Sequence, residues 1–169
     1  MTLTSLKTTD MSDEWGEKAQ ICAPLFHDFG GRTDFHGPIA TALCPDDNSK
    51  VREMLGEPGA GRVLVVEAGG SPRCAMLGDL LAQLAVDNGW AGVLVHGYIR
   101  DSAEMAHMPL GVKALGTLPR KSDKRGAGQT QVTVSFAGVE FRPGDLLYAD
   151  ADGVLVLTAA DAEAPPGSG

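Results

Sequence analysis

Hydrophobic and polar residues alternate along the chain in blocks that predict strands and helices in turn. Residues 39–44, 62–68 and 93–97 form continuous apolar runs rich in β-branched residues, which is typical of strands buried on both faces of a sheet. Residues 113–118 form a further, weaker run of this kind. These four segments are the expected strands of a central sheet.

Helical spacing occupies the segments between these runs. Residues 49–55 and 76–88 carry apolar side chains at the three- and four-residue intervals of a helix face, and Gly89 is placed to end the second helix. Shorter helices are predicted over 10–19 and 102–106. Strands and helices therefore alternate through the first two thirds of the chain.

The last third of the chain has the pattern of β-structure. Residues 131–137 alternate apolar and polar positions, and a short apolar run at 139–141 follows. Residues 146–157 form two apolar runs joined at Asp152-Gly153, which is a hairpin signal. We therefore predict an α/β fold with central parallel strands and a C-terminal run of antiparallel strands.

Length and composition fit one folded unit. Residues 1–160 are predicted to form a single domain, because domains most often have about 100–150 residues, and residues 161–169 a disordered tail. Hydrophobic residues make up 43% and charged residues 21% of the chain, which excludes an intrinsically disordered protein. Glycine, with 22 residues, is about twice as frequent as the usual ~7%.

The net charge of −8 argues against a protein that wraps a nucleic-acid backbone. The charge is uneven, because residues 118–144 hold five basic and two acidic residues. Four of the basic residues form what we call the basic segment: Arg120, Lys121, Lys124 and Arg125. A solvated loop is the simpler interpretation of so short a run, and a contact with an anion or an acidic partner is the alternative.

The sequence does not predict a membrane or exported protein. No apolar run approaches the ~20 residues that span a bilayer, and residues 1–15 lack the apolar core of a secretory signal. Cys22, Cys44 and Cys74 are an odd number without a close pair, as expected of buried free thiols in a reducing compartment. We therefore predict a cytoplasmic protein.

Two loops are the expected places for chemistry, since ligands of α/β sheets bind beyond the carboxyl ends of strands. In the first loop, residues 69–79, the free amides of a helix start offer an anion site suited to a small carboxylate. These amides belong to Gly78, Asp79, Leu80 and Leu81. Close packing of the helix is the alternative explanation for Gly78.

The second loop, residues 97–102, holds Arg100 and Asp101. Taken alone, such a neighbouring pair is most often a surface ion pair of little energetic value. The catalytic interpretation gives Arg100 the role of a planar fork for a carboxylate and Asp101 that of an oxygen ligand for Mg²⁺. A cation beside a bound 2-keto acid polarises its carbonyl group and stabilises an enolate.

Other residue types give weaker signals. The four histidines lack the spacing of a zinc site, and His96, at the end of an apolar strand, is better explained as a packed side chain. Lys113, Lys121 and Lys124 are formal candidates for a Schiff base, but the last two lie in the basic segment without an evident cause for a lowered pKa. No nucleotide-binding or nucleophile-elbow motif is present.

The residues around the two loops resemble one family. Asp79 is followed after twenty residues by Arg100-Asp101, and the intervening text is similar to that of the regulator of ribonuclease activity A-like (RraA-like) proteins, which include class II 4-hydroxy-4-methyl-2-oxoglutarate aldolases. The resemblance runs from about Phe29 to Leu157. It is carried by these segments: 30–53, 58–79, 78–101, 110–129 and 143–157.

The resemblance implies a site, residue by residue. Main-chain amides of Gly78, Asp79, Leu80 and Leu81 correspond to those that bind the pyruvyl carboxylate. Arg100 corresponds to the substrate-binding arginine, and Asp101 to the aspartate that holds Mg²⁺ or Mn²⁺ together with waters. Asp79 corresponds to the residue that binds those waters.

The resemblance also implies an activity and an assembly. The expected reactions are cleavage of 4-hydroxy-4-methyl-2-oxoglutarate to two pyruvates and decarboxylation of oxaloacetate. The expected fold is a compact swivelling β/β/α domain similar to the phosphohistidine domain, assembled as a homotrimer or hexamer. Longer aldolases of the family add an acidic residue from a C-terminal region, which Glu163 does not match, so oxaloacetate is expected to be the easier substrate.

A regulatory binding protein is the alternative function. Some relatives in the family inhibit ribonuclease E by protein contact, and an acidic surface suits a basic partner. A protein that only binds has no need to keep Asp79, Arg100 and Asp101 together. The sequence therefore favours the enzyme.

Overall fold

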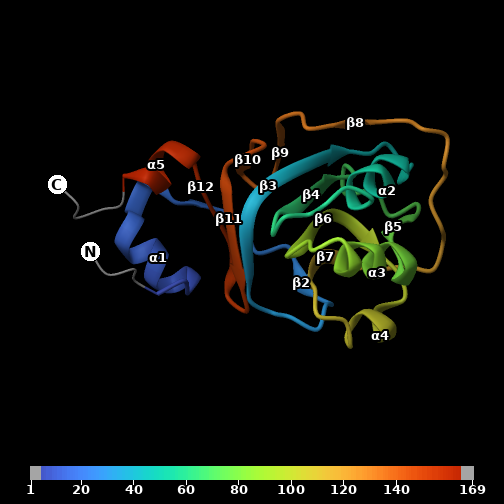
Figure 1. Cartoon of the computed structure of the whole chain (residues 1–169), viewed down its shortest axis with the longest axis horizontal. Helices are drawn as coiled ribbons and strands as arrows, with labels where there is room; N and C mark the ends of the chain where they lie inside the picture. The colour runs from blue at the N-terminus through green and yellow to red at the C-terminus, as the bar shows by residue number, and fades with distance from the viewer. Residues whose placement is uncertain (1–4, 165–169) are drawn as a thin grey trace.

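The predicted central strands lie side by side and parallel in the computed structural model, which describes residues 5–164. Within these residues, ten strands form one curled mixed sheet in which the main path is β1-β12-β11-β3-β4-β6-β7-β2 (Figure 1). The strands are β1 (Gln20–Ile21), β2 (His27–Asp28), β3 (Phe35–Leu43), β4 (Val63–Glu67), β5 (Ala75–Leu77), β6 (Gly92–Ile99), β7 (Gly111–Thr117), β8 (Gln129–Thr130), β9 (Val134–Phe136), β10 (Val139–Phe141), β11 (Leu146–Asp150) and β12 (Gly153–Leu157). The helices are α1 (Thr8–Trp15), α2 (Ser49–Leu55), α3 (Asp79–Asp87), α4 (Ser102–Met105) and α5 (Ala159–Glu163), with a 3₁₀ turn at Gly16–Lys18.

The middle of the sheet is buried on both faces, as its continuous apolar sequences predict. On β4, Leu64 and Val66 point into the core beneath α2 and α3, whereas Val63 and Val65 point into a second core that includes the β9-β10 hairpin. Because both faces of β4 are covered, this strand needs no polar face. The parallel pairs β3-β4, β4-β6 and β6-β7 confirm the predicted central parallel sheet.

The C-terminal strands are antiparallel, which is also confirmed. β11 pairs with both β3 and β12, and β1 extends the edge beside β12. The hairpin turn consists of Ala151 and Asp152, since Asp150 pairs with Gly153, so the turn lies one residue earlier than the Asp-Gly signal suggests.

The predicted helix over 76–88 is wrong at its start. Met76 and Leu77 belong to β5, a short strand that pairs with the end of β6, and α3 begins only at Asp79. Both residues are buried. In the sequence, Leu77 is spaced from Leu81 as on a helix face, although it belongs to the strand. A few apolar residues fit a buried strand as well as a helix face, which explains the error.

α1 packs against the antiparallel end of the sheet, where Met11 contacts a small core with Leu155 and Leu157 (Figure 1). The carboxylate of Asp150 accepts hydrogen bonds from the Thr8 amide (2.8 Å) and the Thr8 hydroxyl (2.7 Å). α5 covers residues for which a disordered tail was predicted from position 161 onward, and its N-cap Thr158 accepts a bond from the Asp161 amide. Residues 165–169 of that predicted tail lie outside the described residues.

The docking of α1 is expected to weaken in acid. Burial alone raises the pKa of Asp150, but the hydrogen bonds from Thr8 and Asp152 and the charge of Lys113 lower it below its ordinary value of 3.8. A carboxylate with a lowered folded-state pKa stabilises the fold fully above its unfolded pKa and loses this contribution as pH falls through the folded value. Urea unfolding should therefore show Asp150→Asn destabilised by about 1 kcal/mol at pH 7, with a smaller difference at about pH 3. A difference that stays constant over this range would contradict the assignment.

Two further expectations concern the whole chain. Cys22, Cys44 and Cys74 are free and buried, as predicted, and burial raises the pKa of Cys22 and of Cys44 to about 12. These thiols therefore stay protonated near neutral pH.

Among residues 5–164, no helix is both long enough and apolar enough to cross a membrane.

Candidate functional site

The two loops predicted to carry chemistry meet at one cavity of about 140 Å³. β5 and β6 run parallel and end side by side, with Leu77 opposite Ile99, and the Arg100 amide donates to the Leu77 carbonyl at 2.9 Å. The residues that follow both strands therefore emerge at the same edge of the sheet. All six predicted site residues line the cavity: Gly78, Asp79, Leu80, Leu81, Arg100 and Asp101.

Asp101 is aimed at the start of α3. Its backbone is left-handed (φ 60°, ψ 40°) directly before α4, a conformation that costs most side chains about 1–2 kcal/mol but that aspartate tolerates comparatively well. Its Oδ2 accepts a hydrogen bond from the Asp79 amide at 3.0 Å. The carboxylate thus accepts a hydrogen bond from the first amide of α3. The N-cap residue of this helix provides no side-chain cap.

Gly78 is needed for space rather than for backbone freedom. Its φ of −123° is open to any residue, but a Cβ at this position would lie 3.0 Å from Asp101 Oδ2 and 3.4 Å from Arg100 Nε. The missing side chain therefore lets both functional groups approach the helix start. This close approach, and not helix packing, is the reason for the glycine.

Gly78→Ala is accordingly expected to lower catalytic efficiency while preserving the fold. The added methyl group displaces the Asp101 carboxylate by a few tenths of an ångström, and small misplacements of reacting groups cost about tenfold in rate. Steady-state kinetics together with a thermal melt would separate the two effects. Full activity in Gly78→Ala would show that the close approach is not required.

Two residues of the basic segment line the cavity, while all four of its basic residues are exposed, as expected of a solvated loop. Lys121 and Lys124 line the cavity together with Arg52. The Ala75 amide donates to the Arg120 carbonyl at 2.8 Å, and Ala75 forms a parallel bridge with Lys121. The alternative interpretation, contact with an anion, therefore fits the position of these side chains.

Two buried polar atoms at the cavity were not foreseen. The Asn48 Nδ2 donates to the Met76 carbonyl at 3.3 Å, which leaves Asn48 Oδ1 buried without a partner among the described residues. The Ser122 Oγ is also buried and unpaired. Both residues line the cavity, and buried polar atoms normally find a partner. A ligand or a water is the expected partner at this position.

The carboxylates fit one type of metal. Asp79 and Asp101 both line the cavity, whereas no cluster of three or more His, Cys, Asp or Glu residues occurs within residues 5–164. Mg²⁺ typically binds one or two carboxylates and keeps several waters, while structural zinc needs four protein ligands. The donor set thus suits Mg²⁺ or the similar Mn²⁺ and does not suit zinc.

Comparison with known families and sequences gives a consistent result. The model of the RraA-like family, described as Aldolase/RraA, matches residues 8–156. A protein of Alkalilimnicola ehrlichii named "Putative 4-hydroxy-4-methyl-2-oxoglutarate aldolase" is 57% identical over 152 residues, which is 90% of this chain and 94% of the relative. A protein of Laribacter hongkongensis with the same name is 57% identical over 148 residues, 88% of this chain and 93% of the relative.

Solved structures share the fold under different names. A Geobacillus kaustophilus protein named S-adenosylmethionine:2-dimethylmenaquinone methyltransferase has a TM-score of 0.89 and 49% identity, covering 95% of this chain and 99% of that one. The RNA-processing inhibitor RraA from Thermus thermophilis has a TM-score of 0.87 and 44% identity, covering 92% and 93%. Because one fold can host several functions, the residues of the site must decide between these activities.

Proposed function

The chain belongs to the RraA-like family, and we propose that it is a divalent-metal-dependent lyase acting on 2-keto acids. Its reactions are cleavage of 4-hydroxy-4-methyl-2-oxoglutarate to two pyruvates and decarboxylation of oxaloacetate. The observation that carries the proposal is the convergence of the α3 amides, Arg100 and Asp101 on one cavity. Its 57% identical relatives, named as aldolases, support the same substrate.

The start of α3 binds and orients the substrate. The amides of Leu80 and Leu81 lie in the first turn of a helix whose dipole favours an anion, and they receive the carboxylate next to the keto group. The guanidinium of Arg100 donates to the keto oxygen, where negative charge develops. Asp101 and Asp79 would hold a divalent cation, Asp101 directly and Asp79 through waters, and when bound the cation would polarise the carbonyl group further.

Both reactions break the bond between C3 and C4 of the substrate and leave its electrons on C3 as a pyruvate enolate. In the aldol cleavage the C4 hydroxyl loses its proton and becomes the carbonyl of the second pyruvate. In the decarboxylation CO₂ leaves, and no hydroxyl proton has to be removed. A proton then adds to C3 in both cases, so Arg100 stabilises the same developing oxyanion in each.

A second carboxylate is common to both substrates. Three basic residues also line the cavity that holds Asp79 and Asp101: Arg52, Lys121 and Lys124. These cations offer a local anion site within a chain whose net charge is −8. We therefore propose dicarboxylic 2-keto acids as the substrate class.

An assembly is part of the proposal. It rests on membership of the RraA-like family, for which the resemblance implies a homotrimer or hexamer. We propose a homotrimer or hexamer, acting in the cytoplasm with its thiols reduced. Light scattering on the purified protein measures the assembly directly.

The decisive experiment measures pyruvate release from oxaloacetate and from the aldol with added Mg²⁺ or Mn²⁺. We expect release from both substrates, faster with oxaloacetate, and loss of both activities on treatment with EDTA. Release that is unaffected by the chelator would contradict the metal-dependent mechanism. No release from either substrate with any divalent cation would contradict the proposed function.

Inhibition of ribonuclease E is the second candidate function. A 44% identical protein covering most of this chain is named an inhibitor of RNA processing, and the net charge of −8 suits a basic partner. RNA cleavage by ribonuclease E, followed with and without micromolar protein, tests this function. An unchanged cleavage rate would exclude it at that concentration.

A further inference from the structure

The basic segment is exposed and belongs to no helix or strand, yet two of its residues, Lys121 and Lys124, line the cavity. They lie on a loop, and loops of this kind are mobile unless something holds their backbone. The contacts that hold this backbone therefore decide where Lys121 and Lys124 lie.

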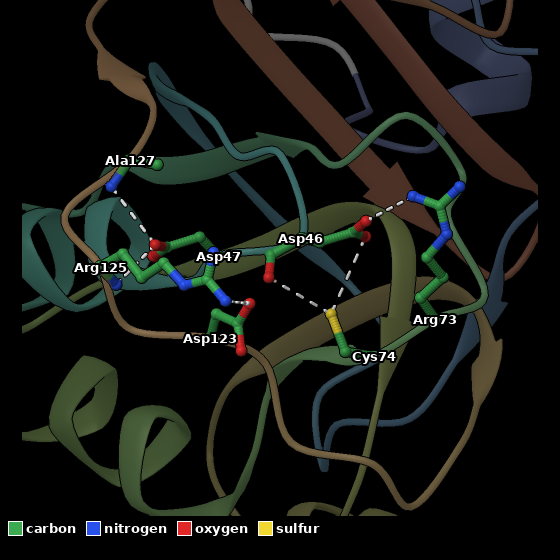
Figure 2. A network of polar contacts seen from close by, with 7 residues as sticks. All are labelled: Asp46, Asp47, Arg73, Cys74, Asp123, Arg125 and Ala127. Atoms are coloured by element: carbon green, nitrogen blue, oxygen red, sulfur yellow. Dashed lines mark hydrogen bonds and ion pairs between the residues drawn. The ribbon is translucent and has the colours of Figure 1, made fainter.

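The carboxylate of Asp47 holds the end of the basic segment. Asp47 is only 2% exposed and lies just before α2. Its Oδ2 accepts hydrogen bonds from the Arg125 amide at 2.6 Å and the Ala127 amide at 3.3 Å (Figure 2). Its Oδ1 accepts one from the Ser49 amide at 2.8 Å. One buried group thus links the first turn of α2 to the end of the basic segment.

The neighbouring residue Asp46 holds a second loop. Its carboxylate pairs with Arg73 at 2.9 Å, and its carbonyl oxygen lies 3.6 Å from the Cys74 thiol (Figure 2). The same carbonyl accepts the Asp123 amide at 3.2 Å. The turn at Asp46 and Asp47 therefore joins the chain before β5 to the chain that carries the basic segment.

Asp47 is ionised under all ordinary conditions. Burial alone raises its pKa, but the bonds from the Ser49 hydroxyl and from the amides of Ser49, Arg125 and Ala127 outweigh burial and lower the pKa to about 2. A carboxylate offers acceptors only, which matches the three amides around it. An amide side chain at this position would instead direct N–H groups at some of these N–H donors.

We propose that Asp47 is a positioning residue for the lyase, and that it holds the basic segment so that Lys121 and Lys124 contact the second carboxylate of a dicarboxylic 2-keto acid. The inference rests on the proposed function. Asp47 does not touch the substrate itself, since its carboxylate is occupied by the loop amides. Its removal therefore affects binding of the second carboxylate and leaves the chemistry at Arg100 and Asp101 intact.

The test compares a dicarboxylate with a monocarboxylate. In Asp47→Asn we expect the KM for oxaloacetate to rise about tenfold, with kcat within about twofold. The KM for pyruvate, followed by NMR as deuterium exchange of its methyl protons, should stay within about twofold, since pyruvate lacks the second carboxylate. The matched control is Asp123→Asn, which removes an exposed partner of Arg125 in the same loop and should leave both KM values unchanged.

Hydrogen–deuterium exchange gives a readout that does not depend on activity. The amides of residues 124–128 should exchange at least about tenfold faster in Asp47→Asn than in the wild type or Asp123→Asn. Unchanged exchange would overturn the inference even in an active enzyme. Faster exchange with an unchanged KM for oxaloacetate would also overturn it, because the loop would then move without consequence for the substrate.

A variant that lacks both lysines tests the same contact if Asp47→Asn does not fold. Replacing both Lys121 and Lys124, which are exposed, by glutamine should raise the KM for oxaloacetate by at least about tenfold. Adding Asp47→Asn to this variant should raise it less than about twofold further, since the two changes act through one contact. An unchanged KM in the lysine variant overturns the inference. Absence of pyruvate release from the wild type is a different failure, because it removes the proposed function and with it the substrate role of Asp47, whatever the exchange rates.

Discussion

Asp101→Asn is expected to lower metal-dependent pyruvate release from oxaloacetate by about 10³-fold. The substitution removes the negative charge that holds the cation, and polarisation of a carbonyl group by a bound metal contributes several kcal/mol to the transition state. Asparagine tolerates the left-handed backbone at this position, and its Oδ1 can still accept the Asp79 amide that now donates at 3.0 Å. The fold and the start of α3 should therefore be preserved.

A control variant separates charge at the site from charge elsewhere on α3. Asp87 is the last residue of that helix and accepts a hydrogen bond from Gln83 at 2.9 Å on the exposed surface. Asp87→Asn should keep its rate within about twofold. Metal titration followed by calorimetry should show binding to the wild type and to Asp87→Asn and none to Asp101→Asn. Equal metal binding in all three proteins would contradict the assignment of Asp101.

The fold could be predicted where a residue pattern is compatible with only one type of secondary structure. The run 62–68 is apolar at nearly every position, and β4 is indeed buried on both faces. The helix over 49–55 was predicted at the bounds of α2. Met76 and Leu77 were assigned to the wrong element because their burial comes from pairing with β6, and the local sequence contains no trace of that contact.

The site could be predicted in part for the same reason. Arg100 and the start of α3 meet because parallel strands end at one edge of a sheet, which is a general rule of such folds. The position of the basic segment depends instead on contacts made far away in the sequence, with Asp47 bonded to the Arg125 amide and Ala75 bridged to Lys121. A short run of basic residues has the same pattern whether a buried carboxylate holds it or water surrounds it. The unpaired atoms of Asn48 and Ser122 were missed because burial of a polar residue is a property of the folded chain alone.

Arg100→Ala is expected to lower kcat/KM for oxaloacetate by about 10²–10³-fold, the usual cost of removing one donor from a developing oxyanion. Arg100 lines the cavity beside Gly78, and its Nη1 lies 3.5 Å from the Pro119 carbonyl. It therefore has few protein contacts to lose, and thermal stability should change little. Arg142→Ala, which removes an exposed arginine paired with Glu140 at 3.0 Å, is the control and should keep full activity.

The shape of the guanidinium group, as well as its charge, should matter for Arg100. Lysine keeps the charge but offers a single ammonium in place of a planar fork, so Arg100→Lys should recover only part of the lost rate. Guanidinium added to the buffer should partly restore Arg100→Ala, because the alanine leaves room for it, and should have little effect on Arg100→Lys. Full activity of Arg100→Lys would mean that a point charge is sufficient at this position. The fork would then have no role in the transition state, and a single positive charge at this position would be enough for the contact to the keto oxygen.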